Sequence, residues 1–314
     1  MGRQRKRKGD PVHGWLAIDK PIDMSSTQVV GKLKRLFNAQ KAGHGGTLDP
    51  LADGILPIAF GEATKTAQWA MDCDKEYVFT VEWGSSTASQ DKEGEVIATS
   101  DIRPTREQIL DVLPRFIGDI QQVPPKFSAI KVDGERAYDL ARDGETFEIP
   151  SREVTVYEAE LVDTPDTDHA VFRVVSGKGF YIRALARDLA QALGAEGHVS
   201  QLRRTRVGGL DEAISVSLET LEGLADDKDQ LMAQLQPLET VLDDVPQIEI
   251  DASDAAALKQ GREIVLLPHL VEQWRAAAET TEAGRLALTM THGKAVALGE
   301  VRAGRFQPKK VFQL

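Results

Sequence analysis

The stretch GHGGTLDPLADG, residues 43–54, combines residue types that do chemistry with a backbone built to turn sharply. His44 and Asp49 can each move a proton, and an ionised aspartate can also act as a nucleophile. Four glycines surround them, and because glycine weakens regular elements, such a cluster indicates a tight turn or a close backbone approach. The alternative is a surface hairpin loop, although the stretch lacks the Ser and Asn that are typical of flexible loops.

Familiar glycine-rich binding loops do not account for this stretch. The phosphate-binding pattern G-x-x-x-x-G-K-[ST] is absent, and the dinucleotide pattern G-x-G-x-x-G fails because Leu48 occupies its third glycine position. A glycosidase would need a second carboxylate beside Asp49, which one sequence cannot identify. Proton transfer and nucleophilic attack therefore both remain open for Asp49.

A second segment, GKGFYIRALARDLA at residues 177–190, could place a charge beside that loop. Its apolar residues follow helical spacing, and Arg183 and Arg187 lie one turn apart. Two glycines precede the helix, so free N–H groups and the positive helix end could face an anion. For the helix itself we favour the alternative, a plain amphipathic helix with a solvated basic face.

Charge is distributed unevenly along the chain. The net charge is −11, and residues 211–260 alone hold thirteen acidic residues against two basic ones. Residues 1–50 hold ten Lys and Arg against four Asp and Glu, and residues 178–206 hold six against two. A polyanion responds to the local field, which fades over about 10 Å at moderate salt. The sequence therefore permits nucleic-acid binding, and residues 1–10 are predicted to form a basic disordered arm.

Composition restricts the compartment and the class of protein. The single cysteine, Cys73, excludes a disulfide framework, and the six histidines show no zinc-binding spacing. No apolar stretch approaches the roughly 20 residues of a membrane span, and the N-terminus lacks the apolar core of a signal peptide. We expect a cytoplasmic protein that uses no metal and no membrane.

The elements that must position these residues alternate without strict βαβ order, which predicts an α+β domain with a mostly antiparallel mixed sheet flanked by helices. A helix is expected to begin at Ser25 or Ser26. Strands are expected over 15–21, 55–60, 75–83, 152–162 and 169–177. Further helices are expected over 63–70, 105–113 and 177–194.

The end of the chain has a different pattern. The acidic segment 237–246 is bounded by prolines and predicts a domain boundary. Short strand-like runs follow, which predicts a small C-terminal β-barrel. Within it, the polar segment 271–284 is expected to be mobile.

Several motifs occur together in an order that resembles the bacterial tRNA pseudouridine synthase B family, the TruB type. The resemblance covers roughly residues 11 to 210, and the combination of G-H-x-G-x-L-D-P with K-G-x-Y-I-R is its most specific part. It implies a pseudouridine synthase fold over 11–245, and residues 246–314 resemble a PUA-type RNA-binding barrel. The segments that carry the resemblance are WLAIDKPIDMSS (15–26), GHGGTLDPLADGILP (43–57), DKEYVFTVEWG (74–84), PPKFSAIKVDGERAYDLAR (124–142), GKGFYIRALARDLA (177–190) and QLRRTRVG (201–208).

The resemblance implies an isomerase that converts uridine 55 in the T loop of tRNA to pseudouridine, as a monomer and without a cofactor. It makes Asp49 the catalytic aspartate. The substrate-binding residues that it implies are His44, Tyr77, Tyr181, Leu202, Arg183 and Lys20, of which Lys20 is expected to support the glycine loop. Phosphate contacts are expected from Arg203, Arg204, Arg206 and Lys178.

The chemistry suits these residue types. Uracil must leave C1′ of the ribose, turn and rejoin through C5, and a carboxylate can either attack C1′ or remove a ribose proton. Arg183 is the candidate that keeps Asp49 ionised. The target base must be flipped out of its stack, and Tyr77 is a suitable surface on which it can stack.

Three alternatives remain open at this point. The first is a non-catalytic RNA-binding or RNA-folding protein, which explains the basic segments but not the glycine loop. The second is a sister pseudouridine synthase that acts on ribosomal RNA or on another tRNA position. The third is a nucleoside hydrolase or glycosidase. The unbroken run of motifs and the terminal barrel favour the T-loop enzyme.

Overall fold

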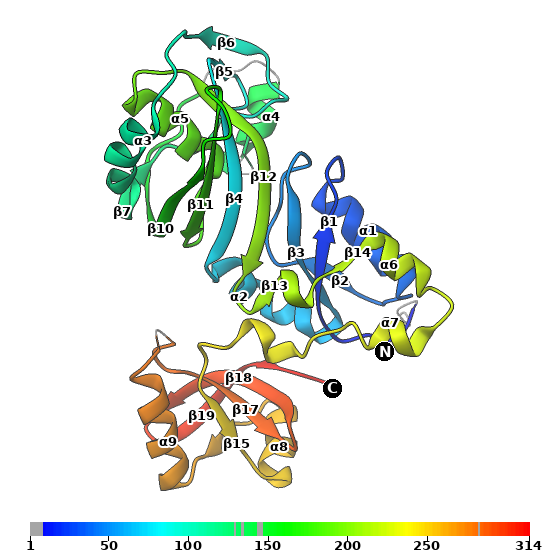
Figure 1. Ribbon diagram of the computed structural model, residues 1–314. Helices are drawn as coiled ribbons and strands as arrows, with labels where there is room; N and C mark the ends of the chain where they lie inside the picture. The colour runs from blue at the N-terminus through cyan, green and yellow to red at the C-terminus, as the bar shows by residue number, and fades with distance from the viewer. Residues whose placement is uncertain (1–8, 129, 133–134, 143–146, 282) are drawn as a thin grey trace.

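A computed structural model of the chain describes residues 9–128, 130–132, 135–142, 147–281 and 283–314. Most of the arm predicted over residues 1–10 lies outside these ranges. A large mixed sheet and a smaller C-terminal sheet dominate the structure (Figure 1).

The large sheet has ten strands in the order β14-β1-β3-β12-β4-β11-β10-β7, with β2 beside β3 and β13 beside β12. Two of its pairings, β1 with β14 and β12 with β3, are parallel, and the others are antiparallel. The predicted mostly antiparallel mixed sheet is therefore confirmed. The strands are β1 Gly14–Lys20, β2 Ala42–His44, β3 Asp53–Phe60, β4 Lys75–Trp83, β7 Gly118–Gln122, β10 Arg152–Asp163, β11 His169–Ser176, β12 Gly197–Val207, β13 Leu210–Asp211 and β14 Val216–Ser217.

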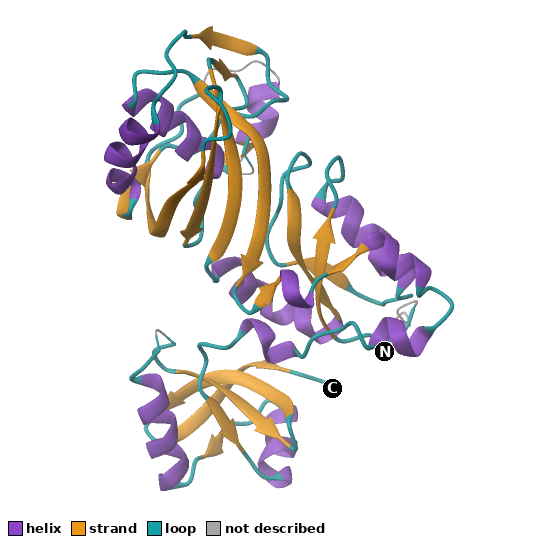
Figure 2. Cartoon of the chain, viewed as in Figure 1, coloured by secondary structure: helices purple, strands orange, loops and turns teal. Residues whose placement is uncertain are grey.

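Helices flank this sheet, as Figure 2 shows, and two short hairpins extend from it. The hairpins pair β5 Ser85–Thr87 with β6 Val96–Thr99, and β8 Lys131–Val132 with β9 Glu135–Arg136. The helix expected over 63–70 is split into a 3₁₀ turn followed by α2. The α-helices are α1 Ser26–Leu36, α2 Ala67–Asp72, α3 Arg106–Val112, α4 Ala137–Arg142, α5 Ile182–Ala192, α6 Leu218–Gly223 and α7 Lys228–Met232, and the 3₁₀ helices are η1 Gly61–Thr66, η2 Leu113–Phe116, η3 Glu212–Ile214 and η4 Leu238–Val241.

The start of α1 shows how the local sequence sets an element. Ser25 is the N-cap, and its side chain accepts a hydrogen bond from the backbone N–H of Gln28 while the Gln28 side chain accepts one from the backbone N–H of Ser25. This capping box pairs N–H groups that the first turn of a helix otherwise leaves free. Val29 and Leu33 are buried, so α1 packs its apolar stripe against the sheet.

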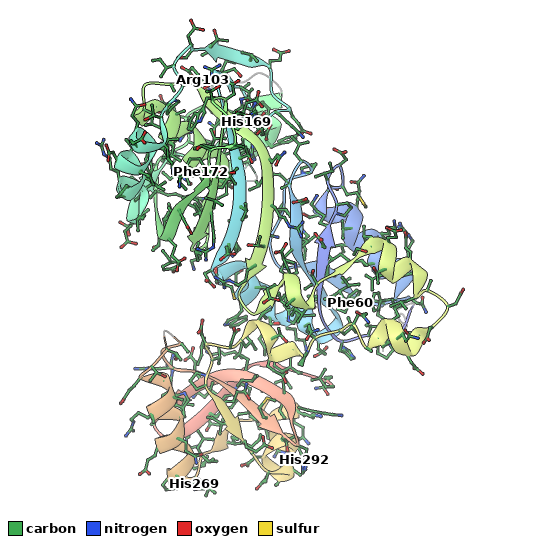
Figure 3. All side chains as sticks on the ribbon, viewed as in Figure 1. Phe60, Arg103, His169, Phe172, His269 and His292 are labelled. Carbon is green, nitrogen blue, oxygen red and sulfur yellow. The ribbon has the colours of Figure 1, made fainter. Side chains whose placement is uncertain are left out.

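Two of the core clusters on the large sheet lie in its separate halves. On β4, side chains at alternate positions are buried, and Phe79 stacks on Phe172 of β11 with ring centroids 5.3 Å apart. The apolar stripe of α5 covers this core. The second core packs α1 against β3 and includes Phe60. Figure 3 shows Phe172 and Phe60 in these separate halves of the sheet, which meet where β12 pairs with both β4 and β3.

The C-terminal sheet has five strands in the order β15-β17-β18-β19-β16 and curls as a half-barrel where a small barrel was expected. Within the segment 271–284, which was expected to be mobile, residues 271–278 lie in α9, and Trp274 donates from Nε1 to the Leu286 carbonyl at 3.0 Å. The elements are β15 Gln247–Glu249, α8 Ala252–Lys259, β16 Ile264–Val265, α9 Pro268–Ala278, β17 Leu286–Thr291, β18 Lys294–Arg302 and β19 Arg305–Val311.

The two sheets share a core cluster. Leu288 and Leu298 of the C-terminal sheet are buried in the same cluster as Trp15 of β1 and Leu238 of η4. Lys65 adds a polar contact by donating to the carbonyl of Val311 at 2.6 Å. The predicted boundary at 245/246 falls beside this junction, and the division itself stays a prediction. Among the described helices, none is long and apolar enough to cross a membrane.

Candidate active site

The glycine loop connects β2 to β3, which are antiparallel neighbours with His44 opposite Ile58. The loop therefore has the topology of a hairpin connection, but side chains from the protein interior bind its backbone. Ser26, at the start of α1, donates from Oγ to the Leu48 carbonyl and accepts from the Leu48 N–H, both at 2.9 Å. This anchor fixes the backbone immediately before Asp49.

Lys20, the last residue of β1, fixes the other side of Asp49. It is fully buried, and its ammonium donates to the carbonyls of Pro21 and Met24 at 2.8 Å and of Pro50 at 3.3 Å. Burial lowers the pKa of Lys20 to about 8. Its expected role in supporting the loop fits these contacts, whereas its grouping with the substrate-binding residues does not, because the side chain is enclosed.

Arg183, in the first turn of α5, reaches Asp49 directly. Its Nη2 lies 2.9 Å from Asp49 Oδ2 and donates to the Phe127 carbonyl at 3.0 Å. Its Nη1 donates to the Ser89 carbonyl at 2.9 Å and lies 3.5 Å from Asp91 Oδ2. The arginine side chain is only 7% exposed, so the expectation of a solvated basic face on α5 is wrong at this position. Acceptors on every side replace the water that the guanidinium loses.

A pocket of about 350 Å³ brings together the residues expected to do the chemistry. Asp49 and Arg183 line it together with Leu202 of β12. Tyr77 from β4 and Tyr181, the N-cap residue of α5, add aromatic surface. The Asp49 side chain remains 41% exposed, so the carboxylate that the buried arginine orients is open to solvent.

Comparison with known proteins assigns the family. Residues 34–182 match the N-terminal domain of the TruB family of pseudouridylate synthases, and residues 183–243 match the C-terminal domain of tRNA pseudouridylate synthase B. A protein named tRNA pseudouridine synthase B from Caulobacter vibrioides is 56% identical over 310 residues, which cover 99% of each chain. The chain belongs to the TruB family. The relative of the same name from Agrobacterium fabrum is 50% identical over 99% of this chain and 98% of its own.

Solved structures agree with the family at the level of the fold. A chain of a Cbf5-Nop10-Gar1 complex superposes with a TM-score of 0.72 at 26% identity, covering 96% of this chain and 85% of that one. A chain of an H/ACA RNP bound to a substrate RNA containing 2′-deoxyuridine gives a TM-score of 0.71 at 24% identity, with coverage of 99% and 92%. The pseudouridine synthase fold expected for a TruB chain is confirmed.

His44, the other chemical residue of the TruB glycine loop, does not line the pocket that contains Asp49. Its Nδ1 is buried and has no hydrogen-bond partner within the described residues. Burial and the charge of Arg204 lower the pKa of His44, so the neutral imidazole is favoured. Its expected substrate contact stays a prediction.

Arg204 has a structural role that corrects the sequence analysis. It is 1% exposed and donates to three backbone carbonyls, those of Ile55 at 2.7 Å, Gly46 at 3.2 Å and Thr47 at 3.3 Å. The predicted phosphate contact of Arg204 finds no support in this arrangement, because the guanidinium is enclosed and already paired with carbonyls where it lines the pocket. The residue instead ties the TruB glycine loop to β12.

The other predicted phosphate contacts differ in how available they are. Arg203 points out of the opposite face of β12, where Asp19 at 3.1 Å and Glu212 at 2.6 Å already neutralise it, and the hydrogen bond with Asp19 raises its pKa. Arg206 is similarly bound to Asp74 at 2.6 Å. Lys178 is 69% exposed and lies 3.3 Å from Asp72, which leaves its ammonium open to solvent. Of the four cations, Lys178 is the most exposed, and its contact with RNA stays a prediction.

The sequence analysis missed three polar residues close to this site. Asp91 is the second carboxylate on Arg183, Gln122 binds the backbone of Tyr181, and Lys75 lines the pocket with a pKa that burial lowers to about 8. Lys75 had a weak signal, because it begins the alternating strand that contains Tyr77. Asp91 in a turn and Gln122 at the end of an edge strand had none.

Metal binding has no obvious place in the TruB site. Within the ranges that the structure describes, no group of three or more His, Cys, Asp and Glu side chains is placed to hold a metal ion. Figure 3 shows His169 at one end of the large sheet and His269 and His292 in the C-terminal part, far from one another. The expectation of a reaction without metal or cofactor stays a prediction.

Proposed function

We propose that this chain isomerises uridine 55 in the T loop of tRNA to pseudouridine. The observation that carries the proposal is the Asp49–Arg183 pair at 2.9 Å, which lines a pocket together with Tyr77 and Tyr181. A pocket of about 350 Å³ accepts one nucleotide flipped out of a loop, and does not accept a stacked loop. Family membership and the names of the relatives support the choice of tRNA.

The reaction balances with the residues of this chain. The bond between C1′ and N1 breaks, uracil turns within the pocket, and C1′ bonds to C5. The proton on C5 then leaves, and N1 gains one. Asp49 either attacks C1′ or takes a ribose proton, and both routes need an ionised carboxylate. The buried guanidinium of Arg183 lies 2.9 Å from Asp49 Oδ2, so it supplies an opposite charge beside the carboxylate and orients it.

Stacking offsets the cost of base flipping. Extruding a base from a folded loop costs a few kcal/mol, and an aromatic face can recover about 1–3 kcal/mol. Tyr77 lines the pocket from the rigid centre of the sheet, on β4, which has a strand on each side. Its ring can therefore receive the base with little reorganisation.

RNA contacts outside the pocket come from two parts of the chain. Lys178 lies in the loop before α5 and meets the phosphate backbone near the flipped nucleotide. The curled C-terminal sheet, which resembles a PUA domain, provides the second contact with the tRNA. The enzyme acts as a monomer, and sedimentation of the free protein and of its tRNA complex measures that state directly.

One assay tests the reaction and separates the alternatives. Unmodified tRNA carrying tritium at uracil C5 is incubated with the wild type and with Asp49→Asn, and released tritium is measured. We expect release by the wild type, none above background by Asp49→Asn, and none from a tRNA with cytidine at position 55. Binding without release would indicate an RNA-binding protein, and free uracil would indicate a hydrolase. Release that persists from the position-55 variant would indicate a sister synthase.

A further inference from the structure

Two polar residues on neighbouring strands contact Tyr181, and neither has a role in the reaction described above. Gln122 is the last residue of β7, and Arg152 is the first residue of β10. They are direct partners in the antiparallel register of these strands, so their Cα atoms lie opposite each other. Both side chains reach the loop that leads into α5.

Gln122 holds the main chain of Tyr181 at both of its polar groups. Its Oε1 accepts from the Tyr181 N–H at 2.9 Å, and its Nε2 donates to the Tyr181 carbonyl at 3.1 Å. Gln122 is only 1% exposed, so solvent does not replace these bonds when they are lost. Because Tyr181 is the N-cap residue of α5, the same two bonds fix the helix start, and Arg183 lies two residues further on.

Arg152 holds the ring and the turn before it. Its guanidinium carbon lies 5.1 Å from the centroid of the Tyr181 ring, a cation–π geometry. Its Nη2 donates to the carbonyl of Gly179, which has a φ of +79° and turns the chain into Tyr181. Gln122 and Arg152 together therefore hold residues 179–181, through the backbone and through the Tyr181 ring.

We propose that Gln122 and Arg152 form a clamp that sets the positions of Tyr181 and Arg183 for the isomerisation. The proposal rests on the proposed function, because it assigns both as positioning residues in that reaction. Neither touches the reacting atoms. Gln122 acts through the backbone of Tyr181, and Arg152 acts through its ring. A misplacement of about 1 Å in a catalytic group can cost on the order of 100-fold in rate, so loosening the clamp slows chemistry more than it weakens RNA binding.

Gln122→Leu tests the clamp, with Gln121→Leu as its matched control on the exposed neighbouring position of β7. We expect Gln122→Leu to lower the single-turnover rate of tritium release at least tenfold and to change the dissociation constant for tRNA by less than about threefold. Gln121→Leu should keep the wild-type rate. Equal rates for the two variants, or a loss of affinity that matches the loss of rate, would overturn the proposal.

Gln122→Glu tests the clamp through the pH dependence of the rate, which would not change if Gln122 only stabilised the fold. The ionised carboxylate still accepts from the Tyr181 N–H but cannot donate to the Tyr181 carbonyl. Protonation restores a donor, so the rate of this variant relative to the wild type should rise as pH falls. A ratio that is flat with pH would count against the clamp. This variant keeps the side-chain volume, so it also covers the case in which Gln122→Leu does not fold.

Arg152 is tested through its coupling to Gln122. If both residues hold one turn, the rate losses of Arg152→Ala and Gln122→Leu should be less than multiplicative in the double variant, whereas independent effects multiply. Multiplicative losses would contradict the clamp. A wild-type enzyme that releases no tritium from tRNA would instead refute the proposed function, so the two failures are distinguishable.

Discussion

At the scale of single residues, the role of a buried charged side chain depends on which groups it contacts. Arg183 is enclosed yet makes contacts with Asp49, Asp91 and two backbone carbonyls. Arg204 is enclosed still further, and within the described residues its hydrogen-bond partners are backbone carbonyls. The first arrangement orients a carboxylate for chemistry, and the second ties a loop to a strand. The same residue type therefore has different roles because its acceptors differ.

Arg183→Lys should separate catalysis from RNA binding. A lysine keeps the charge but cannot span four acceptors, because its ammonium lacks the planar fork of a guanidinium. Loss of a charged hydrogen bond costs on the order of 1.5–3 kcal/mol, so we expect the single-turnover rate to fall by about 10- to 100-fold. The affinity for tRNA, measured by filter binding, should change by less than about threefold. Arg187→Lys, one turn along α5, is the control, and near-normal turnover of Arg183→Lys would rule out the pairing.

Lys20 should make stability depend on pH in a defined direction. Its pKa is about 8 in the folded protein against an ordinary value of 10.5, so between these pH values the unfolded chain binds more protons. The contribution of Lys20 to the free energy of unfolding therefore rises with pH from about 8 to 10.5. Urea denaturation of the wild type and of Lys20→Met measures it, and the difference between the two proteins should grow across this window. A difference that shrinks or stays constant would show that Lys20 is not buried in this way.

At the scale of elements, the site depends on β3 and β12 running side by side. Gly54 of β3 lies opposite Arg204 of β12 in a parallel register. It has a φ of +95°, and a Cβ built there would lie 2.2 Å from the Arg204 carbonyl oxygen. The close approach of these strands brings the buried guanidinium of Arg204 under the glycine loop. Gly43, at the other end of the loop, has open space around its Cβ position.

Gly54→Ala should destabilise the protein, and Gly43→Ala should not. A non-glycine residue forced into a left-handed backbone costs on the order of 1–3 kcal/mol, and the clash with β12 adds to that cost. The control substitution meets no atom, so we expect it to change stability by no more than about 0.5 kcal/mol. Thermal and urea denaturation of both variants measure the difference. Equal stability of the two variants would show that the strands do not approach as described.

At the scale of the whole molecule, function depends on an uneven distribution of charge and on two sheets that share a core. The net charge of −11 comes from the acidic window 211–260, which includes α6 and α7. The active-site pocket, in contrast, is lined by Lys75, Arg183 and Arg204 against one carboxylate, that of Asp49. A polyanion is therefore attracted to the pocket although the molecule as a whole repels it.

Lys178→Ala should reduce the salt dependence of tRNA binding. Each phosphate contact releases about one counterion, so removing one contact should flatten the slope of log affinity against log salt by about one unit. Lys228→Ala is the matched control, because Lys228 is similarly exposed but lies in the acidic window and is bound to Asp10. Filter binding over a range of salt concentrations measures both slopes. An unchanged slope for Lys178→Ala would remove Lys178 from the RNA contacts.

The sequence by itself determined what depends on neighbours along the chain. Alternation over residues 75–83 predicted β4 with its bounds, Ser25 marked the start of α1, and the motifs around Asp49 and Tyr181 carried the family resemblance. Hydrogen bonding within a helix turn and side-chain alternation along a strand are local, so one sequence contains them. Asp49 and Arg183 were singled out through that resemblance, and the structure brings them to 2.9 Å, while the catalytic role of Asp49 stays a prediction.

Only the tertiary structure decided which charged groups are buried and which residues meet across strands. The three arginines of the segment RRTR (203–206) look equally basic in the sequence. In the structure, Arg204 is enclosed beneath the glycine loop, whereas carboxylates neutralise Arg203 and Arg206. Gln122 meets Arg152 only through the register of β7 with β10. Burial and register depend on partners that are remote in sequence, so residue type and spacing do not specify them.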